Sequence, residues 1–151
     1  MIDLTAQLPL LLARAVAWAE EEERRALATG TCLVEAEHAL ARSVGVTRPE
    51  RVRVQVVDAM PIPGDAMLQV AVRQTGMLGP DTRGLTLGHA IFIRRGEQSR
   101  RLLSHELRHV YQYEQAGSIS AFLAVYLRQM LEYGYRDAPL EIDARAYEIG
   151  A

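Results

Sequence analysis

The stretch RLLSHELRHVYQYEQ, residues 101–115, places His105 and His109 four positions apart, with Glu106 next to the first histidine. Side chains four apart on a helix differ by about 40° in direction and about one turn in height, so the two imidazoles can share one ion. Glu106 is rotated by about 100° from His105, so its carboxylate flanks such an ion and reaches a water beside it. The stretch therefore predicts a helix that carries two metal ligands and a general base.

This spacing favours hydrolytic chemistry on zinc. Zinc lowers the pKa of a bound water towards neutrality, and a nearby carboxylate can take the proton of that water and pass it to a leaving amine. A third ligand is needed, and the segment PLEIDARAYE, residues 139–148, offers Glu141 and Asp143. These two side chains point about 200° apart on a helix, so only one of them can face the ion. The residues alone leave that choice open.

Composition narrows the remaining function classes. A chain of 151 residues fits one domain, here residues 1–151, and its single cysteine, Cys32, excludes both an intrachain disulfide and a cysteine-rich zinc site. A net charge of -2 without a basic surface argues against nucleic acid as a partner. We see neither a signal peptide nor a membrane span, and therefore expect a soluble cytoplasmic protein without a membrane partner.

The periodicity of apolar residues changes along the chain and predicts an α+β fold. Helical spacing or capping residues predict five helices, and alternation around Val52, Val54 and Val56 predicts a half-buried strand. We expect GLTLGHAIFIRRG to form one edge strand with a bulge or a close backbone approach at Gly88, whereas residues 67–75 fit either a helix or a strand. The predicted helices are residues 5–28, 31–43, 99–115, 120–133 and 138–149, the last with Asp137 as its N-cap.

The chemistry-bearing residues resemble a known family. The segment HELRH followed by Glu141 is similar to the gluzincins, the zincin metallopeptidases with a glutamate ligand. More narrowly, GLTLGHAIFIRRG, HELRHVYQYEQ and PLEIDARAYE resemble small bacterial zincin-like domains related to the core domain of extracellular contractile injection systems. The resemblance spans about residues 84–148. It implies a zincin-like fold, in which a small twisted mixed sheet packs on the metal helix between further N- and C-terminal helices.

By position, the resemblance makes His105, His109 and Glu141 the zinc ligands and Glu106 the general base of a peptidase. It thus favours Glu141 over Asp143. In the best-known gluzincins, an Asp four residues after the ligand Glu braces a ligand histidine, but here that position is Arg145, so the brace must come from elsewhere. We expect a peptide or protein substrate, held by strand addition along the edge strand, and a protein partner that regulates access.

Two other readings compete with a peptidase. The chain could be a catalytically weak or inactive zincin-like module that binds metal and a partner, for instance as an accessory domain of an injection system or a toxin. Alternatively, both histidines are ordinary helix residues without a metal. An oxyanion formed during hydrolysis needs a hydrogen-bond donor, for which Tyr135 is the first choice among the six tyrosines, and His89 is left unassigned.

Overall fold

The protein was examined as a computed structural model that describes residues 3–150. Within this range the chain forms six α-helices, one short 3-10 helix and four strands. The helices are α1 (Leu8–Thr29), α2 (Glu35–Ser43), η1 (Pro49–Arg51), α3 (Ala66–Thr75), α4 (Arg100–Ala116), α5 (Ile119–Asp137) and α6 (Pro139–Ala146). The strands are β1 (Thr31–Cys32), β2 (Arg53–Val57), β3 (Gly84–Leu87) and β4 (Ala90–Arg94). The predicted α+β class is confirmed.

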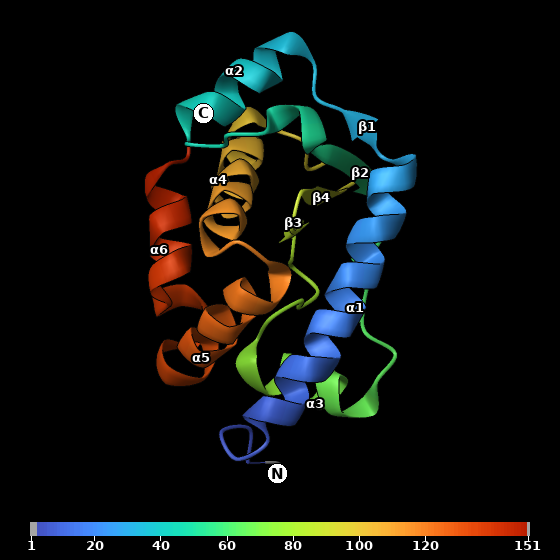
Figure 1. The fold of residues 1–151 in the computed structure, drawn as a ribbon, viewed down its shortest axis with the longest axis vertical. Helices are drawn as coiled ribbons and strands as arrows, with labels where there is room; N and C mark the ends of the chain where they lie inside the picture. The colour runs from blue at the N-terminus through green and yellow to red at the C-terminus, as the bar shows by residue number, and fades with distance from the viewer. Residues whose placement is uncertain (1–2, 151) are drawn as a thin grey trace.

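The strands form one mixed sheet in the order β1-β2-β4-β3. The strand β4 pairs in parallel with β2 and antiparallel with β3, while β1 and β2 are antiparallel. Helix α1 covers one face of the sheet and α4 the other, as Figure 1 shows. Strand β4 is therefore buried on both faces. Its Ile91 and Ile93 join the core beneath α4, whereas its Ala90 and Phe92 join the core beneath α1.

Helix α4, which carries the two histidines, has strong local signals at both ends. The Ser99 hydroxyl accepts a hydrogen bond from the Leu102 N–H at the N-cap, and Gly117 takes the left-handed conformation that ends the helix. Leu103, Leu107 and Val110 pack into the core on the sheet side. This packing fixes the rotation of α4 and thus the direction in which its polar residues point.

Two sequence predictions for the sheet were wrong. The expected helix over residues 31–43 begins only at Glu35, because Thr31 and Cys32 pair with β2 as a strand. The expected single edge strand is a hairpin, in which Gly88 and His89 form the turn between β3 and β4. Gly88 has a φ of 66°, which turns the chain where a bulge was expected. Only β3 is an edge strand, and β4 lies inside the sheet.

The C-terminal helices also differ from the prediction in detail. Residues 67–75, which the pattern left undecided, are helical in α3. Helix α5 continues past Gly134, whose φ of 78° and ψ of 168° interrupt the helix, and ends at Asp137. Asp137 is therefore not the N-cap of α6, because the chain turns at Ala138, which has no side-chain cap. Within residues 3–150, no helix is both long and apolar enough to cross a bilayer.

Candidate metal site

Three buried side chains from two helices meet where α6 crosses α4. His105 and His109 come from α4, and Glu141 comes from the first turn of α6. One Glu141 oxygen lies 3.2 Å from His105 Nε2 and the other lies 3.1 Å from His109 Nε2. One ligand atom from each residue lies within 4.8 Å of the other two. The three residues expected from the sequence are thus brought together in a group that could hold a metal ion.

Asp143, the competing carboxylate, is not part of this group. It lies two residues further along α6, and its carboxylate accepts hydrogen bonds from the Arg108 guanidinium at 2.8 and 3.2 Å. Arg108 is itself held between the rings of Tyr111 and Tyr147. Because the two acidic residues point to different sides of α6, packing that faces Glu141 towards the histidines turns Asp143 towards Arg108.

The second nitrogen of each imidazole also has a fixed partner. His105 Nδ1 lies 2.9 Å from a Glu148 oxygen, and His109 Nδ1 lies 2.7 Å from the amide oxygen of Gln112. The Gln112 amide nitrogen donates to Asp143, and Arg101 binds the other oxygen of Glu148. Since both Nδ1 atoms are occupied, both rings present Nε2 to Glu141. The brace that the sequence lacked at Arg145 is thus supplied three residues later by Glu148.

The Glu141 carboxylate stabilises positive charge on the two imidazole rings. Burial alone would lower the pKa of His109, but hydrogen bonding and charge attraction from Glu141 outweigh burial and raise that pKa to about 9. The pKa of His105 is raised for the same reasons. Burial opposes ionisation of Glu141, yet hydrogen bonds from the two imidazoles bring its pKa far below the usual range. Protons and a metal cation would therefore compete for the Nε2 atoms of the two imidazoles.

Glu106 lies beside this group and faces the edge strand. Its carboxylate accepts a hydrogen bond of 2.8 Å from the Thr86 hydroxyl, which also donates to the Glu106 backbone oxygen. The strand approaches Glu106 so closely that a Cβ atom at Gly84 would lie 2.8 Å from a Glu106 oxygen. Burial raises the pKa of Glu106, although the two histidines and Thr86 counteract it. A raised pKa suits a group that must take up a proton and release it again.

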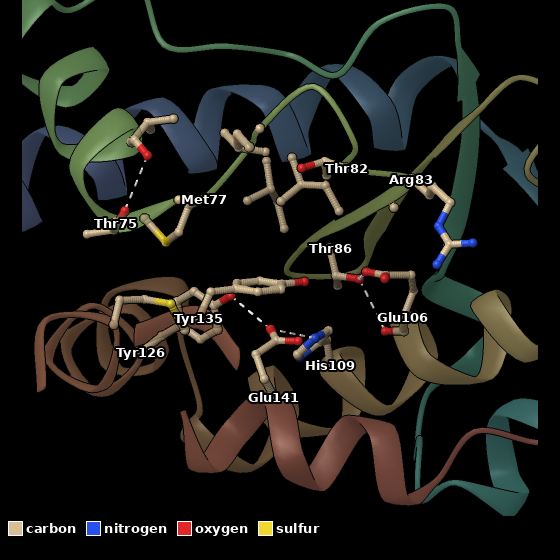
Figure 2. A pocket seen from close by; sticks show the side chains of 18 of the residues that line it. Thr75, Met77, Thr82, Arg83, Thr86, Glu106, His109, Tyr126, Tyr135 and Glu141 are labelled. Carbon is tan, nitrogen blue, oxygen red and sulfur yellow. Dashed lines mark hydrogen bonds and ion pairs between the residues drawn. The ribbon is translucent and has the colours of Figure 1, made fainter. Parts of the chain in front are cut away.

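Two tyrosines lie next to Glu141 in Figure 2. The Tyr126 hydroxyl donates to Glu141 at 2.8 Å, so this side chain helps to orient the carboxylate. Tyr135, the residue chosen from the sequence, lies near Tyr126 and lines the same cavity. His89, in contrast, lies in the hairpin turn and bonds to Glu114 at 3.0 Å, outside the lining of this cavity.

A large cavity of about 1140 Å³ opens onto the metal-binding group. Figure 2 shows His109, Glu141 and Tyr126 on one side of it, and the chain through Met77, Thr82 and Thr86 on the other. Its walls come from α1, α3, α4, α5 and the segment that leads into β3. The lining of this one cavity includes Glu106 as well as His105, His109 and Glu141.

Four residues that shape the site were not singled out from the sequence: Thr86, Gln112, Tyr126 and Glu148. Gln112 could have been found, since a residue three positions after a histidine lies on the same helix face. Glu148 lies within the segment that carries the family resemblance, at its last position. Thr86 and Tyr126 gave no local signal, because they reach the site through packing of β3 and α5.

Comparison with known protein families places part of the chain beside a described domain. The family model described as the eCIS core domain matches residues 69–117, which cover most of α3, the β3–β4 hairpin and α4. The expected resemblance to the eCIS core domain is thus confirmed where the match overlaps it, over residues 84–117, which contain His105, Glu106 and His109 but not Glu141. No curated protein and no solved structure matches the chain.

Proposed function

We propose that this protein is a zinc-dependent hydrolase, and specifically a peptidase, in which His105, His109 and Glu141 hold the ion and Glu106 is the general base. The observation that carries the proposal is the convergence of two Nε2 atoms and one carboxylate in a buried group that opens onto a cavity. No cysteine is involved, and this His₂Glu donor set is one that catalytic zinc uses with a fourth position left for water.

The donor atoms lie near enough to one another to share one ion. Two ligand atoms bound to one zinc ion at about 2.0–2.1 Å in tetrahedral directions lie about 3.3–3.4 Å apart. Each Nε2 atom lies at about this distance from a different Glu141 oxygen, 3.2 Å for His105 and 3.1 Å for His109, and one ligand atom from each residue lies within 4.8 Å of the other two. The occupied Nδ1 atoms support the same assignment, because metal-binding histidines commonly direct their other nitrogen to a carboxylate or amide.

The proposed mechanism divides the work among the residues of the site. A zinc ion held by the three ligands would supply a water of lowered pKa and polarise the substrate carbonyl. Glu106 accepts the proton of the attacking water and then donates it to the leaving amine. Thr86 keeps the Glu106 carboxylate in place, and Tyr135 donates a hydrogen bond to the oxygen of the attacked carbonyl.

The edge strand supports a peptide as the substrate. The Arg94 N–H donates to the Arg83 oxygen, so alternate residues of β3 bond to β4, and Gly84 and Thr86 direct their backbone groups to the opposite edge. The Thr86 oxygen on that edge accepts a bond from Tyr113. An extended peptide pairing at Gly84 would pass Glu106, against which this glycine packs.

Metal content and hydrolysis test the proposal together. Purified protein should contain about one zinc per chain by mass spectrometry. Glu106→Gln should keep this zinc and lose cleavage of a peptide library, whereas Glu97→Gln, a carboxylate of the same cavity bonded to Arg94, should keep both. Cleavage by Glu106→Gln at the wild-type rate would disprove the role of Glu106.

The same experiment separates the peptidase from a metal-binding module without catalysis. A protein that takes up zinc but leaves every member of the library intact would support the module, and a protein that takes up no zinc would exclude both. The eCIS core domain match is compatible with either function, because its description names neither a reaction nor a substrate.

A further inference from the structure

The cavity beside the metal-binding group has mostly apolar walls away from the metal-binding end. Leu8 and Trp18 from α1, Leu68 from α3, and Leu123, Leu127 and Met130 from α5 line it. The polar end of the cavity is formed by Glu106 and Glu141, which lie apart in sequence from these apolar positions. The packing of α1 and α3 against α5 brings the apolar positions together. Apolar side chains that pack against this wall would be removed from water, which favours their binding. A polar substrate would gain no binding free energy there.

The size of the cavity excludes a single side chain as its intended occupant. Pockets for small ligands measure roughly 300–1,000 Å³. The volume of about 1140 Å³ exceeds that range. A ligand that fills it must therefore present several bulky groups, as the alternate apolar residues of an extended peptide do.

The polar border of the cavity favours a peptide over an alkyl chain. Gly84, whose backbone groups point away from β4, lines the cavity together with Thr75 and Thr82, whereas the Thr86 oxygen on the same edge already accepts a bond from Tyr113. Such groups hydrogen-bond the backbone of an extended peptide, but an acyl chain offers them no partner. A peptide thus satisfies the strand edge and the apolar wall at the same time.

We propose that the substrate class is an extended peptide with large aliphatic or aromatic residues at alternate positions, whose side chains enter the apolar cavity while its backbone pairs with β3. This inference rests on the proposed function, to which it adds specificity. Burial of each such side chain contributes enough to change affinity by about tenfold or more. Three of them should separate an apolar peptide from its polar counterpart by at least about 100-fold.

Binding can be measured without turnover. Trp18 is the only tryptophan of the chain and lines the cavity, so its fluorescence reports on an occupant directly. We would titrate zinc-loaded Glu106→Gln protein with a blocked hexapeptide that carries leucine at three alternate positions, and with the same peptide carrying serine at those three positions. The leucine peptide should shift the Trp18 emission and bind at least about 100-fold more tightly. Equal affinities would overturn the proposal.

A matched pair of variants on α5 tests the location. Leu127 lines the cavity, whereas Val125 is 46% exposed on the same helix and does not. Leu127→Asp should weaken binding of the leucine peptide by about tenfold or more, and Val125→Asp should leave it unchanged. Equal effects of the two variants would overturn the proposal. If Leu127→Asp fails to fold, the comparison of the two peptides on Glu106→Gln protein still decides.

Two further outcomes separate this inference from the proposed function. Cleavage of both peptides by the wild-type protein with equal kcat/KM would leave the hydrolase standing and reject apolar specificity. Tight, selective binding of the leucine peptide to a protein that takes up no zinc would support apolar specificity and reject the zinc hydrolase. A lower Kd for decanoate than for the leucine peptide, both measured by Trp18 emission, would reject a peptide occupant in favour of an acyl chain.

Discussion

The bond between Glu148 and His105 allows a quantitative prediction for metal affinity. Glu148 lies 2.9 Å from His105 Nδ1, and its side chain is only 18% exposed, so solvent screens this contact weakly. Residues that brace a metal-binding histidine typically change metal affinity by about 10- to 100-fold, or about 1.4–2.7 kcal/mol. Glu148→Leu removes the acceptor entirely and should approach the upper value.

Glu148→Gln should have the smaller effect. Its amide oxygen can still accept the hydrogen bond from His105, but a charge-assisted bond is about twice as strong as a neutral one. We therefore expect a loss of about tenfold in zinc affinity for Gln and nearer 100-fold for Leu.

The assay is competition for zinc against a chromophoric chelator at one fixed pH, since protons compete with the metal. The control is Glu97→Gln, which removes a cavity carboxylate without a contact to either histidine and should bind zinc like the wild type. An affinity of Glu148→Leu within about twofold of the wild type would refute the bracing role.

Three further predictions concern the surroundings of the site. Thr86→Val should keep zinc but lower kcat by about 10- to 100-fold, because Glu106 loses its hydroxyl donor; wild-type kcat would exclude this role. Gly84→Ala should lower the melting temperature and the activity together, since the new Cβ would meet Glu106 at 2.8 Å, and an unchanged melting curve would contradict that contact. Glu114→Gln should lower the free energy of unfolding by about 1.5–3 kcal/mol at pH 7, as measured with urea. Burial raises the pKa of Glu114, but hydrogen bonds from a backbone N–H and His89 bring that pKa below the usual value. The stabilisation by Glu114 should therefore decline as the pH falls below about 4.3. A stability difference between wild type and Glu114→Gln that grows in acid would contradict this assignment.

The local pattern was sufficient to predict the helix that carries the two histidines and the direction of both rings. Ser99 and Gly117 mark the ends of α4, and the spacing of His105 and His109 places both rings on one face, since both effects act within a few residues. The identity of the third ligand needed more: the residues alone left Glu141 and Asp143 open, and the family resemblance correctly favoured Glu141 as the member of the buried group.

Tertiary packing decided what lies between distant segments. The apolar pattern of residues 84–94 alternates as in one continuous strand, yet Gly88 allows a turn. The result is a hairpin whose second strand, β4, also pairs with β2 and therefore lies inside the sheet. The same long-range contacts bring Thr86 to Glu106 and Glu148 to His105. None of these pairs has a periodicity that a sequence pattern could reveal.

The amino-acid sequence by itself thus determined which side chains of α4 can share an ion, because helix geometry sets their directions within one turn. Only the folded chain decided how α6 is rotated, which carboxylate enters the group, and that an apolar cavity lies beside it. Those features depend on the burial of apolar faces that lie tens of residues apart. The free energy of that burial arises only when the segments pack together, so no single segment determines it.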